Sequence, residues 1–585
     1  MSLITLIVSS IVFFLPISFF LFTGKELQLR EATFIKASVF YLLILVLFSV
    51  IIIRKFVIKF DKKEFILPLS FILIQLLTLI WSINKFEALR TLLLILVGPI
   101  SFIITLFVEN KVFITVASSF TSLLVSSYAI LQQLGFIGHW YKKIGEIDLP
   151  DSSATFEVSN NCVEYLVTVL PLSISLTFTK KGFFRYVALL SCLVSFSFCI
   201  LSGVRAGYFS LVAAILVSTL LIFKKSKRWY SILPLLFLIP FFTSGYVFSR
   251  LLTSFQEIKV FPSSVTFRLE AWKTSLRMIL EKPQGVGIGQ FEVFSQKYKT
   301  EKMDEIIHLL KIMFEDPHNE YLLLACETGI LSLIIFLLFT ARILWIKVKD
   351  LDVISIGLIC GIFSHLVFML FGFALTDPAV KAQFWIQLAL LRNFRFNIEK
   401  GKSISVLFSF LAFASALFMI LSVNETMLTI AKTKGIFYAN RGLYEKALKE
   451  LKKIPDAHFI VARTLMIEGD RRGNLDLFRK ASEYFEEGFK LHPFFGIMRK
   501  EYAKVLYNLG KYTYGIEQLY KSLETEIVAR AEIYALLSVF YSKIGDCQKS
   551  YLYSEKAFSE IKLKPQKEKE LEIKTLILKA RRKCE

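Results

Sequence analysis

Residues 315–339 have the sequence EDPHNEYLLLACETGILSLIIFLLF, and this stretch decides which kind of fold the chain can adopt. It begins with acidic and polar residues and continues as an apolar run that is long enough to enter a bilayer as a helix. His318 lies where the polar part gives way to the apolar part. The stretch therefore predicts a membrane-spanning helix with a titratable side chain at its entrance.

Comparable apolar runs recur along most of the chain. The 585 residues are 55% hydrophobic and only 20% charged, which is too apolar for a soluble protein of this length. A run of about 20 apolar residues crosses about 30 Å of hydrocarbon as a helix. The first run is too long for a signal-peptide core and lacks a basic segment before it, so we expect it to remain as a span. The pattern predicts about thirteen spans, near residues 3–23, 37–54, 65–83, 90–108, 112–135, 161–179, 184–204, 206–223, 230–248, 319–345, 352–375, 381–393 and 403–423.

The basic residues predict how these spans are oriented. The net charge is +22, and much of it lies in short clusters between apolar runs, at 54–63, 180–185, 224–228 and 392–402. Cytoplasmic loops of membrane proteins carry such an excess of Lys and Arg, so we expect these clusters inside and the long loop 249–318 outside. Nucleic-acid binding is not expected from this distribution. An odd number of spans places the chain after residue 425 outside as well, whereas one span fewer would place it in the cytoplasm.

The chain changes character after residue 425, where it becomes polar and amphipathic. Segments 440–451, 508–523 and 543–558 share a Gly, an aromatic or small residue two positions later and a small residue five positions after the Gly, and 481–493 matches the second helix of the same unit. These segments resemble tetratricopeptide repeats, which commonly bind peptides or proteins. An irregular helical bundle is the alternative.

The fold class that follows is all-α, with two domains. We predict a polytopic membrane domain over 1–424 and a helical repeat domain, the C-terminal domain, over 425–585. Of the seven cysteines, Cys547 and Cys584 fall in the C-terminal domain, where the sequence leaves a disulfide between them open. The others lie in or beside spans without metal-ligand spacing and are interpreted as packing residues.

Two arginines and a group of glycines accompany His318 on the predicted outer face. Arg205 stands in LSGVRAGYFSL between two spans, where a charge at membrane depth costs about 2.5–3.5 kcal/mol and is usually paired or functional. Arg268 lies at the edge of the apolar stripe of an amphipathic helix predicted over 266–281. Gly285, Gly287 and Gly289 in GVGIG indicate a tight turn that allows close backbone approach.

Each of these residues also has a purely structural interpretation. An interfacial histidine, an arginine whose head group reaches the membrane surface, and ordinary loop glycines would produce the same local patterns. Asn160, Asn161 and Glu164 lie at the mouth of another span, and either asparagine would serve as a helix cap.

Taken together, these elements resemble the O-antigen ligase and polymerase superfamily of bacterial envelope glycosyltransferases, over about residues 150–395. The resemblance rests on Arg205 in SGVRAG, on Arg268 in FRLEAW and on the series G-x-G-x-G-x-F, H-N-x-Y-L and E-x-G. In this chain the series comprises Gly285, Gly287, Gly289, Phe291, His318, Asn319, Tyr321, Leu322, Glu327 and Gly329. The stretch ATFEVSNN departs from the glycine-rich pattern that the family often has there, which weakens any role for the two asparagines.

The resemblance implies a multi-spanning, GT-C-like protein of the bacterial inner membrane. Such a protein moves a glycan from undecaprenyl diphosphate to an acceptor on the outer side, without a metal or another cofactor. It further implies that Arg205 and Arg268 hold the diphosphate and that His318 acts on the acceptor. Asn319, Tyr321, Glu327 and the three glycines of GVGIG would support them.

The residue types agree with this chemistry. Guanidinium groups match phosphate oxygens in a two-pronged geometry, and an imidazole with an ordinary pKa is mostly neutral at pH 7 and accepts a proton. We find no paired acidic metal motif on this face, so we expect no metal dependence.

The acceptor stays open, between a lipid A core, a growing lipid-linked glycan and a protein. The partner of the repeats, the sugars and the oligomeric state stay open as well. Outside this class, the chain could be a transporter or a non-catalytic scaffold for polysaccharide export. The sequence lacks the paired broken helices near the bilayer midplane that many transporters show.

Overall fold

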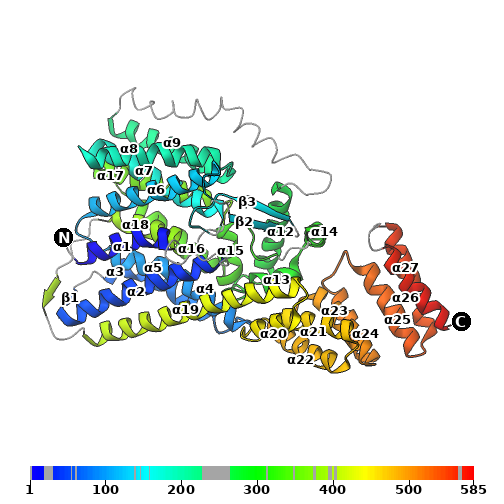
Figure 1. Ribbon diagram of the computed structural model, residues 1–585. Helices are drawn as coiled ribbons and strands as arrows, with labels where there is room; N and C mark the ends of the chain where they lie inside the picture. Colours follow the sequence, from blue (N-terminus) through cyan, green and yellow to red (C-terminus); the bar gives the residue numbers. More distant parts are fainter. Residues whose placement is uncertain are drawn as a thin grey trace.

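The computed structural model describes residues 3–18, 30–54, 56–58, 62–137, 140–144, 147–156, 158–226, 264–310, 314–346, 350–372, 377–392, 398–400, 405–563 and 570–584. Helices dominate this part of the chain, as the sequence predicts (Figure 1). The membrane domain contains α1 (Leu3–Ile17), α2 (Arg30–Arg54), α3 (Lys62–Thr78), α4 (Lys85–Ile95), α5 (Val97–Thr105), α6 (Lys111–Gln133), α7 (Ser159–Thr179), α8 (Phe183–Leu201), α9 (Arg205–Ser226), α15 (Glu320–Thr328), α16 (Ile330–Leu344), α17 (Val353–Phe368), α18 (Pro378–Leu390) and the first part of α19 (Ser405–Asn440).

Several of these helices are long and apolar enough to cross a membrane. Seven candidates occur within the described ranges, and four shorter apolar helices accompany them. The predicted span at 230–248 lies outside the described residues. The predicted span at 319–345 is not one helix, because it is divided between α15 and α16. Gly329 adopts a φ of +88° at that point, a conformation that interrupts a helix and that glycine tolerates.

The centre of the membrane domain is built around α7 and α18. Every residue of α18 is buried, and this helix packs against α5, α7, α17 and α1. Asp377 starts α18 by accepting the backbone N–H groups of Ala379 and Val380. The same carboxylate lies 2.6 Å from the ammonium group of Lys36 on α2, and both side chains are buried. This buried ion pair fixes α2 against the start of α18.

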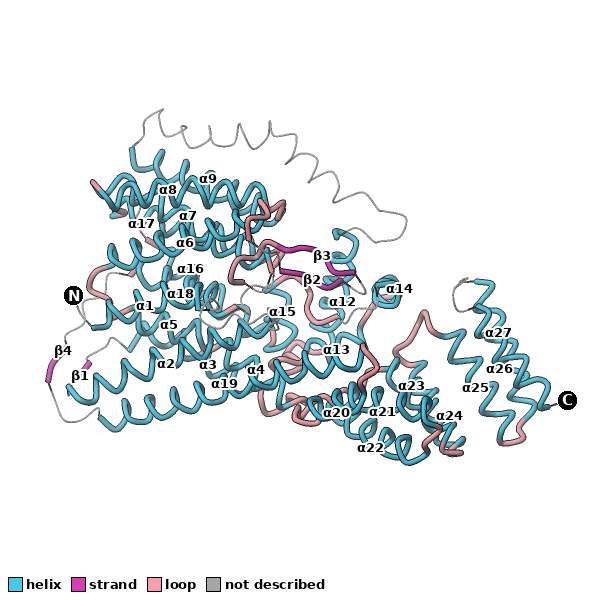
Figure 2. The backbone as a smooth tube through the Cα atoms, in the orientation of Figure 1, coloured by secondary structure: helices cyan, strands magenta, loops and turns pink. Residues whose placement is uncertain are grey.

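Two short antiparallel strand pairs supplement the helices. Strand β1 (Phe56–Ile58) pairs with β4 (Ile398–Lys400), with Phe56 opposite Lys400. Strand β2 (Trp140–Ile144) pairs with β3 (Ile147–Asp151), with Trp140 opposite Asp151. Figure 2 shows β1 and β4 at the end of the molecule remote from the C-terminal domain. The β1–β4 pair joins two of the basic clusters, 54–63 and 392–402, which the charge pattern places on one side of the membrane.

At the other end of the membrane domain lie α12 (Ser264–Glu281), α13 (Phe291–Tyr298) and α14 (Glu301–Leu310), the loop helices. They form an apolar core of their own with α15, which includes Met278, Phe291, Met303 and Phe314. Figure 1 shows them between the membrane helices and the C-terminal domain.

The C-terminal domain consists of helices that pack on their neighbours along the chain. They are α20 (Tyr444–Leu451), α21 (His458–Arg472), α22 (Leu475–Leu491), α23 (Gly496–Asn508), α24 (Tyr512–Leu523), α25 (Arg530–Lys543), α26 (Cys547–Leu563) and α27 (Glu570–Cys584). Gly510 and Gly545 have φ angles of +73° and +82° where α23 and α25 end. The predicted domain boundary at 424/425 falls inside α19, which runs continuously from one part into the other. A disulfide joins Cys547 to Cys584, the pairing that the sequence leaves open.

A buried group of charges fastens the C-terminal domain to the loop helices. The Lys299 ammonium lies 2.6 Å from an oxygen of Asp304 and 3.1 Å from an oxygen of Glu526, which precedes α25. His308 Nε2 lies 2.9 Å from the other oxygen of Glu526. Burial alone would raise the pKa of the Glu526 carboxyl, but His308 and Lys299 lower it to about 2. The second oxygen of Asp304 accepts two backbone N–H groups that follow Glu526.

This contact predicts that Lys299→Met loosens the C-terminal domain from the loop helices. Removing the ammonium group leaves the buried carboxylates of Asp304 and Glu526 without their lysine partner. Breaking a buried ion pair in this way lowers stability by about 3–5 kcal/mol. The expected result is faster hydrogen exchange of the amides in α13, α14 and 526–528.

Lys302→Met is the matched control, because its ion pair with Glu305 is exposed, with side chains 55% and 41% accessible. Equal exchange in the two variants would show that the buried group of charges does not hold the domains together.

Candidate active site

Arg205, Arg268 and His318 come from three separate elements at the end of the membrane domain that carries the loop helices. Arg205 is the first residue of α9, Arg268 lies in the second turn of α12, and His318 precedes α15. Burial lowers the pKa of the Arg268 guanidinium, and the nearby charge of Arg205 lowers it further, whereas Asp316 raises it. The imidazole of His318 lies 5.4 Å, centroid to centroid, from the ring of Phe267. The structure thus places Arg205 within electrostatic range of Arg268, and it places His318 against Phe267, the residue before Arg268.

Aromatic contacts bring together the face of α9 that carries Arg205 and the face of α12 that carries Arg268. Phe209 lies one helical turn after Arg205, and Trp272 lies one turn after Arg268, so each aromatic ring is on the same helix face as its arginine. Both rings contact Phe371, with centroids 5.5 Å and 6.4 Å away. Phe371 therefore joins the arginine-bearing faces of α9 and α12.

Buried donors lie on the α12 side of this junction. Within the described part of the chain, Nε of Arg268 and Nε1 of Trp272 are buried without a hydrogen-bond partner. Buried polar groups are normally hydrogen-bonded, so these two donors are in a position to bind a ligand that offers acceptor oxygens.

His318 occupies an unusual backbone conformation. Its φ is +50°, a left-handed value that non-glycine residues rarely adopt. The backbone N–H of His318 donates to Oδ1 of Asp316 over 2.7 Å, which stabilises the turn. Nδ1 of the imidazole lies 3.5 Å from the same carboxylate oxygen, and 26% of the side chain is accessible.

The predicted supporting residues Asn319 and Tyr321 fasten α15 to the end of α17. Asn319 caps α15 by accepting the N–H of Leu322 over 3.0 Å, and its Nδ2 donates to the carbonyl of Leu370 over 3.1 Å. The Tyr321 hydroxyl donates to the carbonyl of Leu366 over 2.8 Å. These bonds hold the start of α15, next to His318, in place. They give the Asn and the Tyr of the H-N-x-Y spacing a structural role.

The glycine segment, residues 285–291, packs closely against the backbone at Glu327 and at Glu87. A Cβ on Gly285 would lie 2.4 Å from the carbonyl oxygen of Glu327, and one on Gly289 would lie 2.7 Å from that of Glu87. The N–H of Gly287 donates to the Glu327 carbonyl over 2.9 Å, and the N–H of Phe291 donates to the Glu327 carboxylate over 3.1 Å. Glu327 and the glycines therefore lock the loop helices onto the joint between α15 and α16.

The interpretation of Asn160 or Asn161 as a helix cap is wrong. Helix α7 begins at Ser159 after Val158, which makes no side-chain cap, and both asparagines lie inside the helix. Asn161 and Glu164 are buried, and Glu164 Oε1 lies 3.3 Å from Nδ1 of His365 on α17. The sequence predicts neither this pair nor the contact of Asp316 with His318. The D-P-H spacing could have indicated the contact of Asp316 with His318, because an aspartate two residues ahead can accept a backbone N–H in a turn.

One group of metal-type ligands gathers in the described residues, namely Asp304, His308 and Glu526. The Lys299 ammonium already contacts both carboxylates, so the group is balanced by a protein cation. It is interpreted as the ion-pair network of the domain contact.

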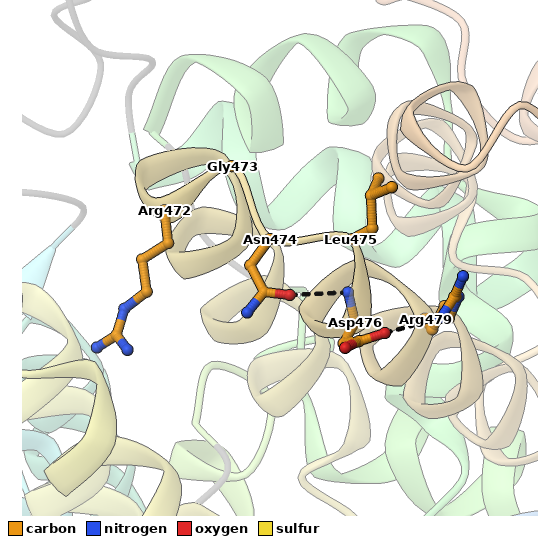
Figure 3. Close-up of a pocket in the computed structure, with 6 residues that line it drawn as sticks. All are labelled: Arg472, Gly473, Asn474, Leu475, Asp476 and Arg479. Carbon is orange, nitrogen blue, oxygen red and sulfur yellow. Dashed lines mark hydrogen bonds and ion pairs between the residues drawn. The ribbon is translucent and has the colours of Figure 1, made fainter.

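A surface hollow lies elsewhere, in the turn between α21 and α22 (Figure 3). Its walls are polar and exposed, and they bond to one another: Asn474 caps the N–H of Asp476, and Arg479 pairs with the Asp476 carboxylate over 2.7 Å. It contains none of the predicted site residues and does not compete with the arginine and histidine group.

The glycine segment generates a stability prediction. In Gly285→Ala the new methyl group collides with backbone at a φ of +85°, so we expect a loss of about 3 kcal/mol or more from overpacking and strain. The measurement is the yield and thermal midpoint of the purified protein.

Gly510→Ala is the control for strain alone, because its φ is +73° and no atom lies within 4 Å of the added Cβ. A Gly285→Ala protein as stable as that control would contradict the close packing of the glycine segment.

Comparison with known families gives a match to part of the chain. Residues 190–337 match the family model described as O-Antigen ligase, and the matched segment contains Arg205, Arg268 and His318. No curated protein matches the chain. The match supports the resemblance found in the sequence, while the likeness of the C-terminal domain to tetratricopeptide repeats stays a prediction. The chain is thus similar over residues 190–337 to the O-antigen ligase family, and together with the seven candidate spans among the described residues this match supports ligase- or polymerase-type glycan transfer at a membrane.

Proposed function

We propose that the protein transfers a glycan from undecaprenyl diphosphate to an acceptor hydroxyl, at the membrane face that carries the loop helices. The observation that supports this most is that α9 and α12 both pack on Phe371 next to Arg205 and Arg268, while His318 contacts Phe267, the residue before Arg268. The charge of Arg205 is also near enough to lower the pKa of Arg268. The two positive charges suit the dianionic diphosphate of the donor. The imidazole suits the removal of a proton from the acceptor hydroxyl.

The arginines would hold the diphosphate. Each guanidinium offers donors in a planar fork that matches phosphate oxygens, and a partly buried site strengthens the attraction. The bound anion would reduce the repulsion between the two arginines. They would also stabilise the charge that develops on the leaving diphosphate, so we propose a mechanism that needs no metal.

His318 would act as the general base. The imidazole takes the proton of the acceptor hydroxyl while the hydroxyl oxygen forms a bond to the anomeric carbon of the donor sugar. The bond from that carbon to the phosphate oxygen breaks, and undecaprenyl diphosphate leaves with the electron pair. A single displacement of this kind inverts the anomeric centre.

Two features favour an extracytoplasmic site at a bacterial inner membrane. The β1–β4 pair brings two basic clusters together at the opposite end of the membrane domain, as expected of its cytoplasmic side. The C-terminal domain packs on the loop helices and contains a disulfide, which is typical of an oxidising compartment.

Three kinds of acceptor fit the proposed reaction equally well. A lipid A core would make the protein a ligase, a second lipid-linked glycan a polymerase, and a serine or threonine a protein oligosaccharyltransferase. Because the C-terminal domain is fastened to the loop helices, we propose that it recruits an acceptor or an assembly partner beside the site. Release of lipid diphosphate from a labelled donor separates all three enzymes from a transporter or a scaffold.

His318→Ala is predicted to reduce glycan transfer by about 10²–10⁴-fold, the usual contribution of a general base. The assay uses purified protein with undecaprenyl-diphosphate glycan and separate acceptors, and it measures labelled product and released lipid diphosphate. His458→Ala, in the C-terminal domain, is the control and should keep full activity. Normal transfer by His318→Ala protein would remove the imidazole from the mechanism.

Arg205→Lys is predicted to lower transfer about ten- to a hundredfold, because a lysine keeps the charge but loses the fork, at about 1.5–3 kcal/mol. Arg185→Lys makes the same exchange at an exposed position at the start of α8 and should be neutral. Wild-type rates in both variants would indicate that Arg205 only anchors α9 at the membrane surface.

A further inference from the structure

We propose that Asp316 is the positioning residue for the catalytic imidazole: its carboxylate holds the His318 turn and directs Nδ1–H toward itself, so that Nε2 receives the acceptor proton. This inference rests on the proposed function, because it assigns a role within the same site. Nothing in the O-Antigen ligase match assigns a function to Asp316.

The first support is the backbone geometry. His318 needs a left-handed conformation, which strains a residue with a Cβ and persists only where neighbouring groups hold it. Oδ1 of Asp316 accepts the His318 N–H over 2.7 Å, and Pro317 between them restricts the chain further. The aspartate therefore fixes the direction in which the His318 side chain leaves the backbone.

The second support is the side-chain geometry. The same oxygen lies 3.5 Å from Nδ1, too long for a well-formed hydrogen bond but short enough to become one with a small ring rotation. Catalytic hydrogen bonds are often long before the substrate binds and shorten in the reactive complex. A carboxylate on Nδ1 sets the tautomer, and the proton-accepting nitrogen is then Nε2.

The third support is the charge balance. Among the described residues, Arg268 of α12 and Glu320 of α15 both interact electrostatically with Asp316, and Arg205 of α9 interacts with Arg268. Asp316 offsets the positive charge of Arg268 in the unliganded protein. A bound diphosphate would take over that role, and the carboxylate would then serve the imidazole alone.

Asp316→Asn separates the two tasks of the carboxylate, because an asparagine side-chain oxygen still accepts the His318 N–H while the negative charge is lost. The structure predicts a ten- to a hundredfold lower kcat with an unchanged KM for the lipid-linked donor. The acidic limb of the pH–rate profile should also move to lower pH. A carboxylate stabilises the protonated imidazole, so without it the ring becomes a free base at lower pH. Arg205, Arg268 and Glu320 are present in both proteins, which assigns the movement to Asp316.

Asp316→Ala removes both tasks and is expected to lose more activity than Asp316→Asn. Glu305→Gln is the matched control, since it removes a partly exposed carboxylate from α14 in the same loop and should change neither kcat nor the pH profile.

Wild-type kcat in the asparagine variant would overturn the inference. A lower kcat with an unmoved acidic limb would also overturn it, because a purely structural role does not shift that limb. The proposed function is tested separately in the same assay, because it fails only if the wild-type protein itself releases no lipid diphosphate.

Discussion

The proposed site depends on the packing of α9 and α12 on Phe371, which places the helices that carry Arg205 and Arg268 next to each other. Arg205 and Arg268 repel each other, and burial on the α12 side adds to the cost of the Arg268 charge. The fold supports this arrangement with Phe371 between the two helices and with Asp316 as a nearby negative charge. An anion with several oxygens is the ligand that would relieve it, which is why a diphosphate is central to the proposed reaction.

The remainder of the molecule keeps the helices that carry these groups in place. The glycine segment and Glu327 lock the loop helices onto the joint of α15 and α16, and Asn319 and Tyr321 tie α15 to the end of α17. From the other side, Lys299 and Glu526 fasten the loop helices to the C-terminal domain. The C-terminal domain is therefore a fixed neighbour of the loop helices, and we propose that it presents an acceptor or partner to the site.

The sequence predicts the helical architecture, because apolar length is a strong local signal. It also singles out Arg205, Arg268 and His318, whose shared role stays a proposal. The sequence also predicts a close backbone approach at Gly285, Gly287 and Gly289. In the structure these glycines lie against other backbone segments of the same chain. The sequence does not predict the break at Gly329, because one glycine in an apolar run does not by itself end a helix. The role of Asp316 depends on a left-handed φ at His318, and the pair of Glu164 with His365 depends on the packing of α7 against α17; neither can be read from residue types alone.

The most direct test of the central claim is photocrosslinking with a lipid diphosphate analogue whose reactive group lies next to the phosphates, followed by peptide mapping of the full-length protein in nanodiscs. We expect labelling of the start of α9, of α12 around Arg268 and of the segment around His318, with competition by undecaprenyl diphosphate. Competed labelling confined to the β1–β4 end or to the C-terminal domain would contradict it.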